Sequence, residues 1–571
     1  MIAGVVDPRG AEEARATLFR MSPSWRDVRE GFGAVVARDN EPNDAIVLGE
    51  TSRFEDAARV VHGGAFIALD PAGDAVVVSR GSFGGRPVFH ARLGSGANVV
   101  CSRLAPILAA EPEARFRPNP DRLSSLCAGI PNPRVDASPF AGIERVAPCT
   151  TMRFRGEHAE VRVLPRTTLS PIEGRADELA EELWRRFERS VARAIGDAKS
   201  VAVTVGGGID SSALLAAAVA LSRGASARDV HTLALDFDAE GSDRPYLQAL
   251  AAELGILPVR LAPRDAAEFY QSSFLLDAQP YILSIGPMER LMAKRAKELG
   301  ASLILSGNFG DEILAGDLRG FAAEAAGGAP FKAACAALRL RVPWDSTPRE
   351  RFEGYVVRPL LKPFVPTCLM EDNGRTQDEQ IYPWAGPRMR DVLRELRRQG
   401  ATKLAPRTPT QRFEHFTRAD IYADCSDWRA QMESMTGVIR KDPYADEDVM
   451  DFTARVRPTT LSHGDLYRGL FRLSIRGRVP AKIVHRMDKC AFEPAFSEVA
   501  EAAGGFETLG DLWTPRALER LGVVDAAHFR ASMAPLFREP SSTPVSAILW
   551  SLATQVLSCE LFARTYGEDL T

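Results

Sequence analysis

A run of glycines with one carboxylate and two hydroxyls carries the sharpest chemical signal in this chain of 571 residues. The run GGGIDSS begins at Gly206, follows the apolar segment VAVTV and precedes a stretch rich in Ala and Leu. Glycines let the backbone approach an anion closely, and a helix N-terminus offers free N–H groups. The candidate phosphate ligands are Gly206, Gly207, Gly208, Ser211 and Ser212. Asp210 would repel a phosphate on its own, so we expect it to bind Mg²⁺.

A second run, SGNFGDE from Ser306 to Glu312, has the same character and also follows an apolar segment. Two such loops at the ends of neighbouring parallel strands would bring Asp210 and Asp311 together. The two carboxylates could then share one or two Mg²⁺ ions that bridge nucleotide phosphates. For the first loop alone, a turn whose Ser and Asp only cap a helix would be the better interpretation. The presence of the second loop favours a nucleotide site.

The segments around these loops alternate between strand and helix patterns. Apolar side chains at every fourth position predict an amphipathic helix before the first loop. They are Leu179, Leu183, Phe187, Val191 and Ile195. Farther along, VAVTV, TLALDF, LPVRL and SLILS alternate with helical patterns, which predicts a doubly wound parallel sheet with ligands at the carboxyl ends of its strands. We expect this nucleotide-binding core over residues 174–320 and a mostly helical part with the substrate cleft over 321–571.

Residues 1–165 show a different pattern of short strands and tight turns. The strand candidates are FGAVVA, AIVLGE, AFIAL, AVVVSR, RPVFHARL and NVVCS. Alternation of apolar and polar residues, with frequent Gly and Asp-Pro between the segments, predicts a β-rich layered domain. The stretch RVLPRTTLSPIEGR reads as the linker to the second domain. The fold class is therefore α/β, with a β-rich N-terminal domain.

Composition excludes several classes of function. A net charge of -4 gives no reason to expect nucleic acid or an acidic membrane as a partner. No apolar run is long enough to cross a bilayer, and the segment MIAGVVDPRG lacks the features of a signal peptide. The eight cysteines are scattered, which is typical of reduced core residues. We therefore expect a cytoplasmic protein.

The two loops resemble the signatures of a known family. GGGIDSS is similar to the SGGxDS pyrophosphate loop of asparagine synthetases, and SGNFGDEILAGD is similar to their SGxGxDExxxGG signature. The resemblance implies a PP-loop ATP-pyrophosphatase synthetase domain, as in β-lactam synthetases and lasso peptide cyclases. GGRPVFHARL and NVVCSRLAPIL resemble parts of that family's N-terminal Ntn-glutaminase domain. The resemblance thus extends over nearly the whole chain.

The family resemblance implies a reaction in which ATP transfers AMP to a carboxylate, pyrophosphate leaves and an amine attacks the acyl-adenylate. In this reaction the first loop would hold the pyrophosphate, and Asp210 and Asp311 would bind Mg²⁺. Ser306 and Gly307 would lie against the nucleotide, and the backbone of Leu235 would contact adenine. RGLFRLSIRGRVPAKIVHRMDKCAF resembles the run K-x-x-LR…R-x-K-x-G-F of the family. This match implies that Lys489 is the catalytic lysine that stabilises developing negative charge, with Arg486 as an assistant.

Three departures from the family pattern bear on function. Gly206 stands where the loop usually begins with Ser, so one hydroxyl contact is lost. Ile2 stands where glutamine-dependent members carry the nucleophilic Cys, and the first cysteine is Cys101, so we expect no glutaminase reaction. Asn308 replaces an acidic residue or Tyr, and an amide cannot accept a proton from an ammonium group. Glu433 and Tyr422 are the candidates for a replacement base.

These departures favour a lasso peptide cyclase, that is, a macrolactam synthetase acting on a ribosomally made peptide. It would adenylate an Asp or Glu side chain of a linear core peptide, and the α-amine of that peptide would close the ring. The expected cofactors are ATP and Mg²⁺, and the expected partners are the precursor peptide, a leader peptidase and a leader-binding protein. One alternative is an ammonia- or amine-using synthetase of the asparagine or β-lactam type that acts on a small metabolite. The other is an inactive nucleotide-binding scaffold.

Overall fold

The computed structural model describes most of residues 1–571. The exceptions are residues 24, 26, 32–33, 39–45, 51–64, 71–72, 82–85, 112–115, 164–167, 224–227, 239–241, 316–317, 366–377, 419, 489, 491, 539–543 and 568–571. Among the described helices, none combines the length and the apolar character that crossing a membrane requires.

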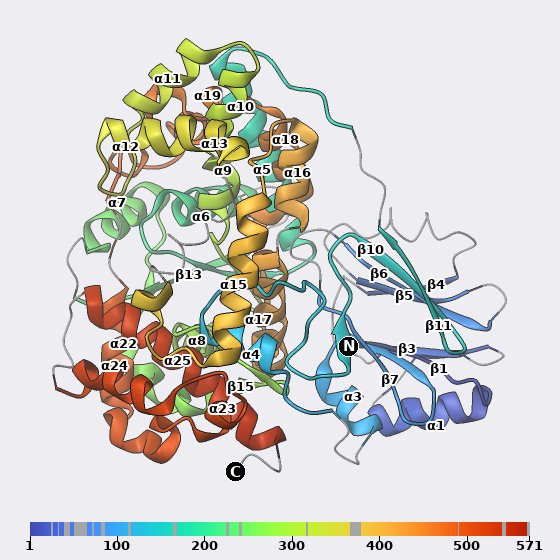
Figure 1. Cartoon of the computed structure of the whole chain (residues 1–571). Coiled ribbons are helices and arrows are strands. Elements are labelled where there is room, and N and C mark those ends of the chain that lie inside the picture. Colours follow the sequence, from blue (N-terminus) through green and yellow to red (C-terminus); the bar gives the residue numbers. More distant parts are fainter. Residues whose placement is uncertain are drawn as a thin grey trace.

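The N-terminal part contains two β-sheets that lie face to face (Figure 1). The first has the strand order β2-β3-β1-β8-β7-β9 and is antiparallel, and the second has the order β11-β10-β6-β5-β4, in which β4 and β5 run parallel. Their bounds are β1 (Ile2–Val6), β2 (Asp27–Glu30), β3 (Ala34–Arg38), β4 (Ile46–Glu50), β5 (Ala65–Leu69), β6 (Ala75–Arg80), β7 (Phe89–Arg92), β8 (Asn98–Cys101), β9 (Ile143–Arg145), β10 (Thr150–Arg155) and β11 (His158–Val163). The six segments predicted as strands overlap β3 to β8.

Side chains that point alternately to the two faces of each strand explain why the N-terminal part is layered. In β1, Ile2 and Val6 point into the core between the two sheets, together with Val78 of β6. Ala3 and Val5 point the other way, into a core that includes Leu18 of α1 (Ala11–Met21). Successive residues of a strand face opposite sides, so a continuous apolar strand can be buried on both faces.

A third sheet, with five parallel strands, forms the centre of the remaining chain. Its strand order is β14-β13-β12-β17-β18, and every neighbouring pair is parallel. The bounds are β12 (Ser200–Thr204), β13 (Asp229–Leu235), β14 (Val259–Leu261), β17 (Leu303–Leu305) and β18 (Ile439–Lys441). The four strands predicted from VAVTV, TLALDF, LPVRL and SLILS are therefore confirmed. The fifth strand, β18, was not predicted, since its segment lies within the part expected to be mostly helical.

Helices cover both faces of this sheet. Val201 and Val203 of β12 pack with α5 (Ala176–Ile195), α6 (Ile209–Ser222) and α7 (Arg244–Leu254), whereas Ala202 packs on the face that holds α8 (Gly286–Glu298). Pro287 stands in the first turn of α8, where its fixed φ and missing N–H suit a helix start. The doubly wound arrangement expected from the alternating pattern is thus present.

The rest of the chain is mostly helical. Its helices are α9 (Gly310–Ala315), α10 (Gly320–Ala326), α11 (Pro330–Arg339), α12 (Pro348–Phe352), α13 (Arg358–Leu361), α15 (Pro387–Thr402), α16 (Pro409–Arg418), α17 (Asp420–Thr436), α18 (Glu447–Arg455), α19 (Pro458–Leu461), α20 (Gly469–Ser474), α21 (Ala481–Val484), α22 (Glu493–Ala502), α23 (Arg516–Arg520), α24 (Ala526–Arg538) and α25 (Pro544–Tyr566). The N-terminal part adds α3 (Leu104–Ala110) and α4 (Pro120–Cys127).

Helix α17 joins the N-terminal part to the parallel-sheet domain through a buried ionic cluster. Arg145 Nη1 lies 2.8 Å from Asp424 and 2.6 Å from Asp427, and Arg122 Nη2 lies 2.7 Å from Asp424. Arg80 lies 3.5 Å from Asp427, and all five side chains are at most 6% exposed. Removal of one partner from such a cluster leaves a buried charge without compensation, which is strongly destabilising. The cluster therefore fixes the N-terminal part against α17.

Candidate active site

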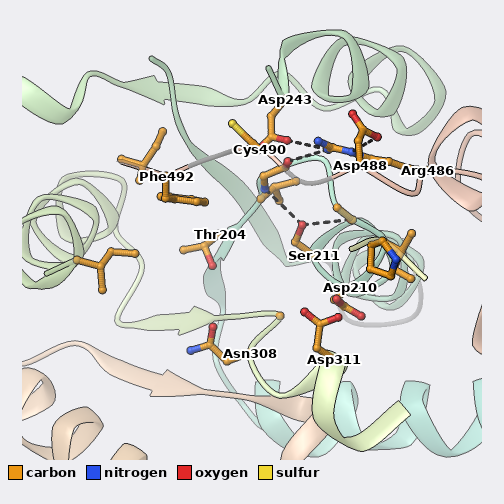
Figure 2. A pocket seen from close by; sticks show the side chains of 18 of the residues that line it. Thr204, Asp210, Ser211, Asp243, Asn308, Asp311, Arg486, Asp488, Cys490 and Phe492 are labelled. Atoms are coloured by element: carbon orange, nitrogen blue, oxygen red, sulfur yellow. Dashed lines mark hydrogen bonds and ion pairs between the residues drawn. The ribbon is translucent and has the colours of Figure 1, made fainter. Parts of the chain in front are cut away.

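A cavity of about 360 Å³ opens at the carboxyl ends of the parallel strands (Figure 2). It is lined by Thr204 at the end of β12, Leu235 at the end of β13 and Gly307 just beyond β17. Parallel strands place all their carboxyl ends along one edge, which is where ligands bind in open α/β sheets. The volume lies within the range of small-molecule sites in proteins.

The first glycine-rich loop forms one wall and leads into the N-terminus of α6. Gly207 has a φ of 69°, and a Cβ atom there would lie 2.8 Å from Cβ of Tyr246. Gly208 has an ordinary φ of -74°, and a Cβ atom there would meet nothing within 4 Å. The hydroxyl of Ser211 accepts a hydrogen bond from Gly206 N and donates one to Gly208 O, both at 3.3 Å. The loop thus turns its open side and the free N–H groups of α6 towards the cavity.

The second loop packs directly on the first. A Cβ atom on Gly307 would lie 3.0 Å from Ser211 N, and one on Gly310 would lie 2.5 Å from Oδ1 of Asp210. Phe309 between them has a φ of 69°, a left-handed conformation that is unfavourable for a residue with a bulky side chain. Both glycines are therefore required for the close contact between the two loops.

Asp210 and Asp311 lie together and share one arginine. Nη1 of Arg468 donates to Asp210 Oδ1 at 2.5 Å and Oδ2 at 2.7 Å, and Nη2 lies 3.0 Å from Asp311 Oδ1. The described residues include no group of three or more His, Cys, Asp or Glu side chains that could hold a metal ion by themselves. Two carboxylates are nevertheless the protein ligands that Mg²⁺ takes when phosphates and water complete its shell. The pair therefore fits a magnesium nucleotide.

A rigid arginine borders the phosphate side of the cavity. Arg486 Nη1 lies 2.7 Å from Asp243 Oδ1, and its guanidinium stacks 3.9 Å from the ring centre of Tyr246. The same Nη1 donates to Gly206 O at 3.4 Å. Burial raises the pKa of the Asp243 carboxyl, although Arg486 acts in the opposite direction. This arrangement holds a positive charge beside the first loop, where phosphates would bind.

The opposite end of the cavity is apolar. Its lining comes from the ends of the central strands, from α8 and from the chain before α22. The side chains are Leu233, Leu235, Phe237, Ile285, Met292 and Phe492. The rings of Phe237 and Phe492 lie 5.6 Å apart. A site with one apolar and one polar, cationic end suits a ligand that joins a flat base to phosphates.

The strand that was not predicted, β18, contributes the residue that holds the second loop. Asp442 follows β18 and accepts hydrogen bonds from the Ser306 hydroxyl and from Arg429 Nη1, the latter at 2.9 Å. Ser306 N also donates to Lys441 O at 3.1 Å. Ser306 therefore ties the second loop to the end of β18, and its side chain is not among those lining the cavity.

The structure brings most of the predicted site residues together. The cavity is lined by Gly206, Gly208, Asp210, Ser211, Leu235, Gly307 and Asp311. Gly207, Ser212 and Ser306 are not among the lining residues, and Ser212 is fully buried in α6. Lys489 lies outside the described residues, between the cavity residues Asp488 and Cys490. Its predicted role stays a prediction.

The three residues considered for proton transfer differ in position. Asn308 lines the cavity and is exposed (Figure 2). Glu433 is engaged, since Oε2 lies 2.5 Å from Arg86 Nη2 and Oε1 accepts a hydrogen bond from Arg440 N at 2.9 Å. Glu433 is also not among the residues that line this cavity. The side chain of Tyr422 lies outside the described residues.

Sequence reasoning missed Arg468, Arg472 and Asp243. Arg468 and Arg472 are the first and fifth residues of RGLFR, the run that resembles K-x-x-LR, so a signal for both was present. Asp243 stands in the segment DRPYLQ at the start of α7, where a carboxylate reads as a helix N-cap. Burial and the repulsion of nearby Arg468 lower the pKa of Arg472 to about 10. Only the folded arrangement shows that these charges meet at one cavity.

Comparisons with known proteins found one family match and a structural match at low identity. The solved structure of the U34-tRNA thiolase NcsA from Methanococcus maripaludis with its 4Fe-4S cluster is similar at 14% identity and a TM-score of 0.19, over 39% of this chain and 80% of that chain. A comparison with curated proteins found no match. The family model for asparagine synthase matches residues 182–563, which is more than half of the chain. The chain therefore belongs to the asparagine synthase family.

Proposed function

We propose that this protein adenylates a carboxylate with ATP and then joins it to an amine. Its family forms carbon–nitrogen bonds in an ATP-dependent reaction. The observation that carries the proposal is the meeting of two loops, each with glycines and a carboxylate, at the phosphate end of one cavity. In the first step a carboxylate oxygen bonds to the α-phosphorus and pyrophosphate leaves. In the second, the amine nitrogen bonds to the acyl carbon, the amine gives up a proton and AMP leaves.

The residues around the cavity would divide these tasks. The N–H groups of the first loop and of α6, with Ser211, would hold the phosphates that leave as pyrophosphate. Arg486 would add a fixed positive charge where negative charge grows on the leaving group. Asp210 and Asp311 would hold a magnesium ion, which supplies charge neutralisation at the phosphates. The predicted role of Lys489 is to stabilise the negative charge that develops on the adenylate and on pyrophosphate in both steps.

The N-terminal part would be a glutaminase-like domain without its reaction. Ile2 is fully buried in β1, where a side chain cannot meet a substrate. The first cysteine along the sequence, Cys101, is also fully buried, and burial raises the pKa of its thiol to about 12. Such a thiol is a poor nucleophile, because the thiolate is the reactive form. The amine would therefore come with the substrate or from solution, and this domain would serve to hold α17 through its buried arginines.

The substrate we propose is a linear peptide that carries both reacting groups. The segment from α11 to the residues just after α13 exposes several apolar side chains, namely Phe331, Leu338, Leu361 and Phe364. The same segment reaches the cavity through Pro343, next to the partly exposed Trp344. We propose that a bound peptide covers these side chains, which a small acid is too small to do.

An internal amine would also account for Asn308. A nucleophile held against its target contributes roughly 7–11 kcal/mol through proximity alone, which lessens the need for a strong base. We therefore propose a lasso peptide cyclase, in which an Asp or Glu side chain is adenylated and the α-amine of the same peptide closes the macrolactam. A leader peptidase and a leader-binding protein would supply that peptide.

Product analysis tests the proposal. ATP consumption is resolved into AMP plus pyrophosphate or ADP plus phosphate, with linear precursor peptides and with free Asp plus ammonia, and Asp210→Ala serves as the inactive control. AMP formed only with a peptide, together with a peptide product lighter by one water, supports the cyclase. AMP formed with the free acid would replace the peptide by a small metabolite. ADP as the product, or no turnover with either acceptor, would overturn adenylation.

A further inference from the structure

The guanidinium of Arg468 contacts both Asp210 and Asp311, so it takes the position of a metal ion bound by the two carboxylates. Its side chain is 5% exposed, and one guanidinium reaches both oxygens of Asp210 and one oxygen of Asp311. Burial opposes its charge, but the two carboxylates outweigh burial and raise the pKa of Arg468. The site thus carries its own positive charge without any metal ion.

Neighbouring groups hold this arrangement. The hydroxyl of Tyr444 donates to Asp210 O at 2.9 Å, and the hydroxyl of Tyr467 donates to Asp311 O at 3.2 Å. The guanidinium of Arg468 lies 5.2 Å from the centre of the Tyr467 ring, within reach of a cation–π contact. The backbone of Arg468 has a φ of 56°, a conformation that costs free energy and persists only where the surroundings impose it.

A divalent cation would need the same carboxylate oxygens. Mg²⁺ takes oxygen ligands at about 2.0–2.1 Å in an octahedron. It therefore cannot share this space with a guanidinium that donates to both oxygens of Asp210 and lies 3.0 Å from Asp311 Oδ1. Phosphate oxygens are an alternative partner for the arginine, because guanidinium groups bind phosphates in the same forked geometry as carboxylates. Nucleotide phosphates would therefore free the two aspartates.

We propose that Arg468 is an internal counter-ion that excludes divalent cations from Asp210 and Asp311 until nucleotide phosphates draw it away. The inference rests on the proposed binding of a magnesium nucleotide, and it makes Arg468 a positioning residue for that site. It predicts that the protein without nucleotide binds divalent cations poorly at this pair and binds them well only together with a nucleotide.

Binding of Mn²⁺ to the protein without nucleotide tests this directly. Electron paramagnetic resonance measures the free Mn²⁺ for the native protein, for Arg468→Gln and for the double variant Arg468→Gln with Asp210→Asn. We expect Arg468→Gln to bind Mn²⁺ at least about tenfold more tightly than the native protein, since the coupling of close buried charge pairs exceeds that factor. The double variant should lose the gain. Equal affinity of the native protein and Arg468→Gln would overturn the proposal.

Arg472→Gln is the matched control. Arg472 lines the same cavity and is buried, but its described hydrogen bonds go to the backbone oxygens of Tyr467 and Val484. If general removal of positive charge were the cause, Arg472→Gln would raise the Mn²⁺ affinity as much as Arg468→Gln does, and that result would contradict the proposal. We expect a much smaller change.

Thermal unfolding gives a second readout. Arg468→Gln removes the positive charge that Asp210 and Asp311 share, so it should have a lower Tm, and Mn²⁺ should restore part of that loss. Mn²⁺ should leave the Tm of the native protein almost unchanged, and the same Tm response in both would count against the counter-ion role. If Arg468→Gln does not fold, Arg468→Lys replaces it in both assays, because lysine keeps the charge but lacks the fork. We expect Arg468→Lys also to bind Mn²⁺ more tightly than the native protein does. The absence of such a gain would contradict the proposal.

A third experiment distinguishes failure of this proposal from failure of the proposed function. Calorimetry with the ATP analogue α,β-methylene-ATP, with and without Mn²⁺, measures nucleotide binding to the native protein. Analogue binding that strengthens with Mn²⁺ supports the release of the aspartates by phosphates. Analogue binding that is the same with and without Mn²⁺ would overturn that release. Absence of all analogue binding would overturn the nucleotide site itself, whereas the Mn²⁺ comparison of the nucleotide-free variants would still decide whether Arg468 excludes the cation.

Discussion

Gly310 packs against the carboxylate of Asp210, and no larger residue fits between them. A Cβ atom on Gly310 would lie 2.5 Å from Asp210 Oδ1 and 2.6 Å from its Cγ. The two residues stand on different loops that follow β12 and β17, so this contact couples the two halves of the candidate site. Glycine is needed at position 310 for a steric reason, because the carboxylate of Asp210 from the other loop occupies the space of a side chain.

Gly310→Ala should therefore displace Asp210 and impair the reaction. A shift of about 1 Å in a functional group costs about 100-fold in rate, and we expect a loss of at least that order in AMP formation. The control is Gly400→Ala in α15, where a Cβ atom would meet nothing within 4 Å. Alanine there should change stability by no more than about 1 kcal/mol, in the favourable direction. Activity of Gly310→Ala close to that of the native protein would refute the steric argument.

Gly208→Ala should separate folding from nucleotide binding. The residue has an ordinary backbone conformation and open space around its Cα, so the variant should keep the native Tm. The added methyl group would stand in the cavity where phosphates approach the backbone, and we expect weaker binding of a nucleotide analogue in calorimetry. Gly207→Ala should lower both Tm and affinity, because of its left-handed conformation and the contact with Tyr246. Unchanged affinity in Gly208→Ala would place the phosphates elsewhere.

Asn308→Ala should have little effect on the rate of amide formation. An amide side chain cannot act as a base, and loss of a true general base lowers rates by about 10²–10⁴-fold. We expect a fall of less than about tenfold in steady-state turnover with the peptide substrate. A larger loss, with binding of the nucleotide analogue unchanged, would assign Asn308 a direct part in the reaction.

The buried cluster on α17 predicts a defined dependence of stability on pH. Burial raises the pKa of the Asp424 carboxyl, but Arg122 and Arg145 outweigh burial and hold that pKa below its usual value of about 3.8. A carboxyl whose pKa is lower in the folded state stabilises the fold when ionised, and this contribution disappears as pH falls through the folded-state pKa. We expect Asp424→Asn to cost about 3 kcal/mol at neutral pH.

Urea unfolding at several pH values measures this difference. The loss in Asp424→Asn relative to the native protein should stay constant at neutral and weakly acidic pH and should shrink below about pH 4. Asp391→Asn is the control, since Asp391 forms an exposed ion pair with Arg394 at 2.7 Å. Such pairs contribute about 0–1 kcal/mol. A difference for Asp424→Asn that is equally small would mean that the cluster does not hold the two parts together.

The pattern of residues by itself determined the two loops and the elements that carry them. Each loop is a short run whose glycines, hydroxyls and carboxylate are adjacent, and each follows an apolar strand. Such local features depend on a few neighbouring positions, so periodicity and turn chemistry suffice to predict them. The four predicted strands of the parallel sheet and the meeting of Asp210 with Asp311 follow from the same kind of reasoning.

Only the tertiary structure decided which distant residues complete the site. Arg468 meets Asp210 across 258 positions, and Asp442 meets Ser306 across 136 positions. Strand β18 is as short as β14 and β17, but its residues are Ile, Arg and Lys, so it has only one apolar side chain to indicate a strand among the helices around it. These contacts depend on strand order and on how the C-terminal helices fold back over the sheet. Many residues of a long chain could pair with a given buried charge, and only the packing of the folded chain determines which of them does.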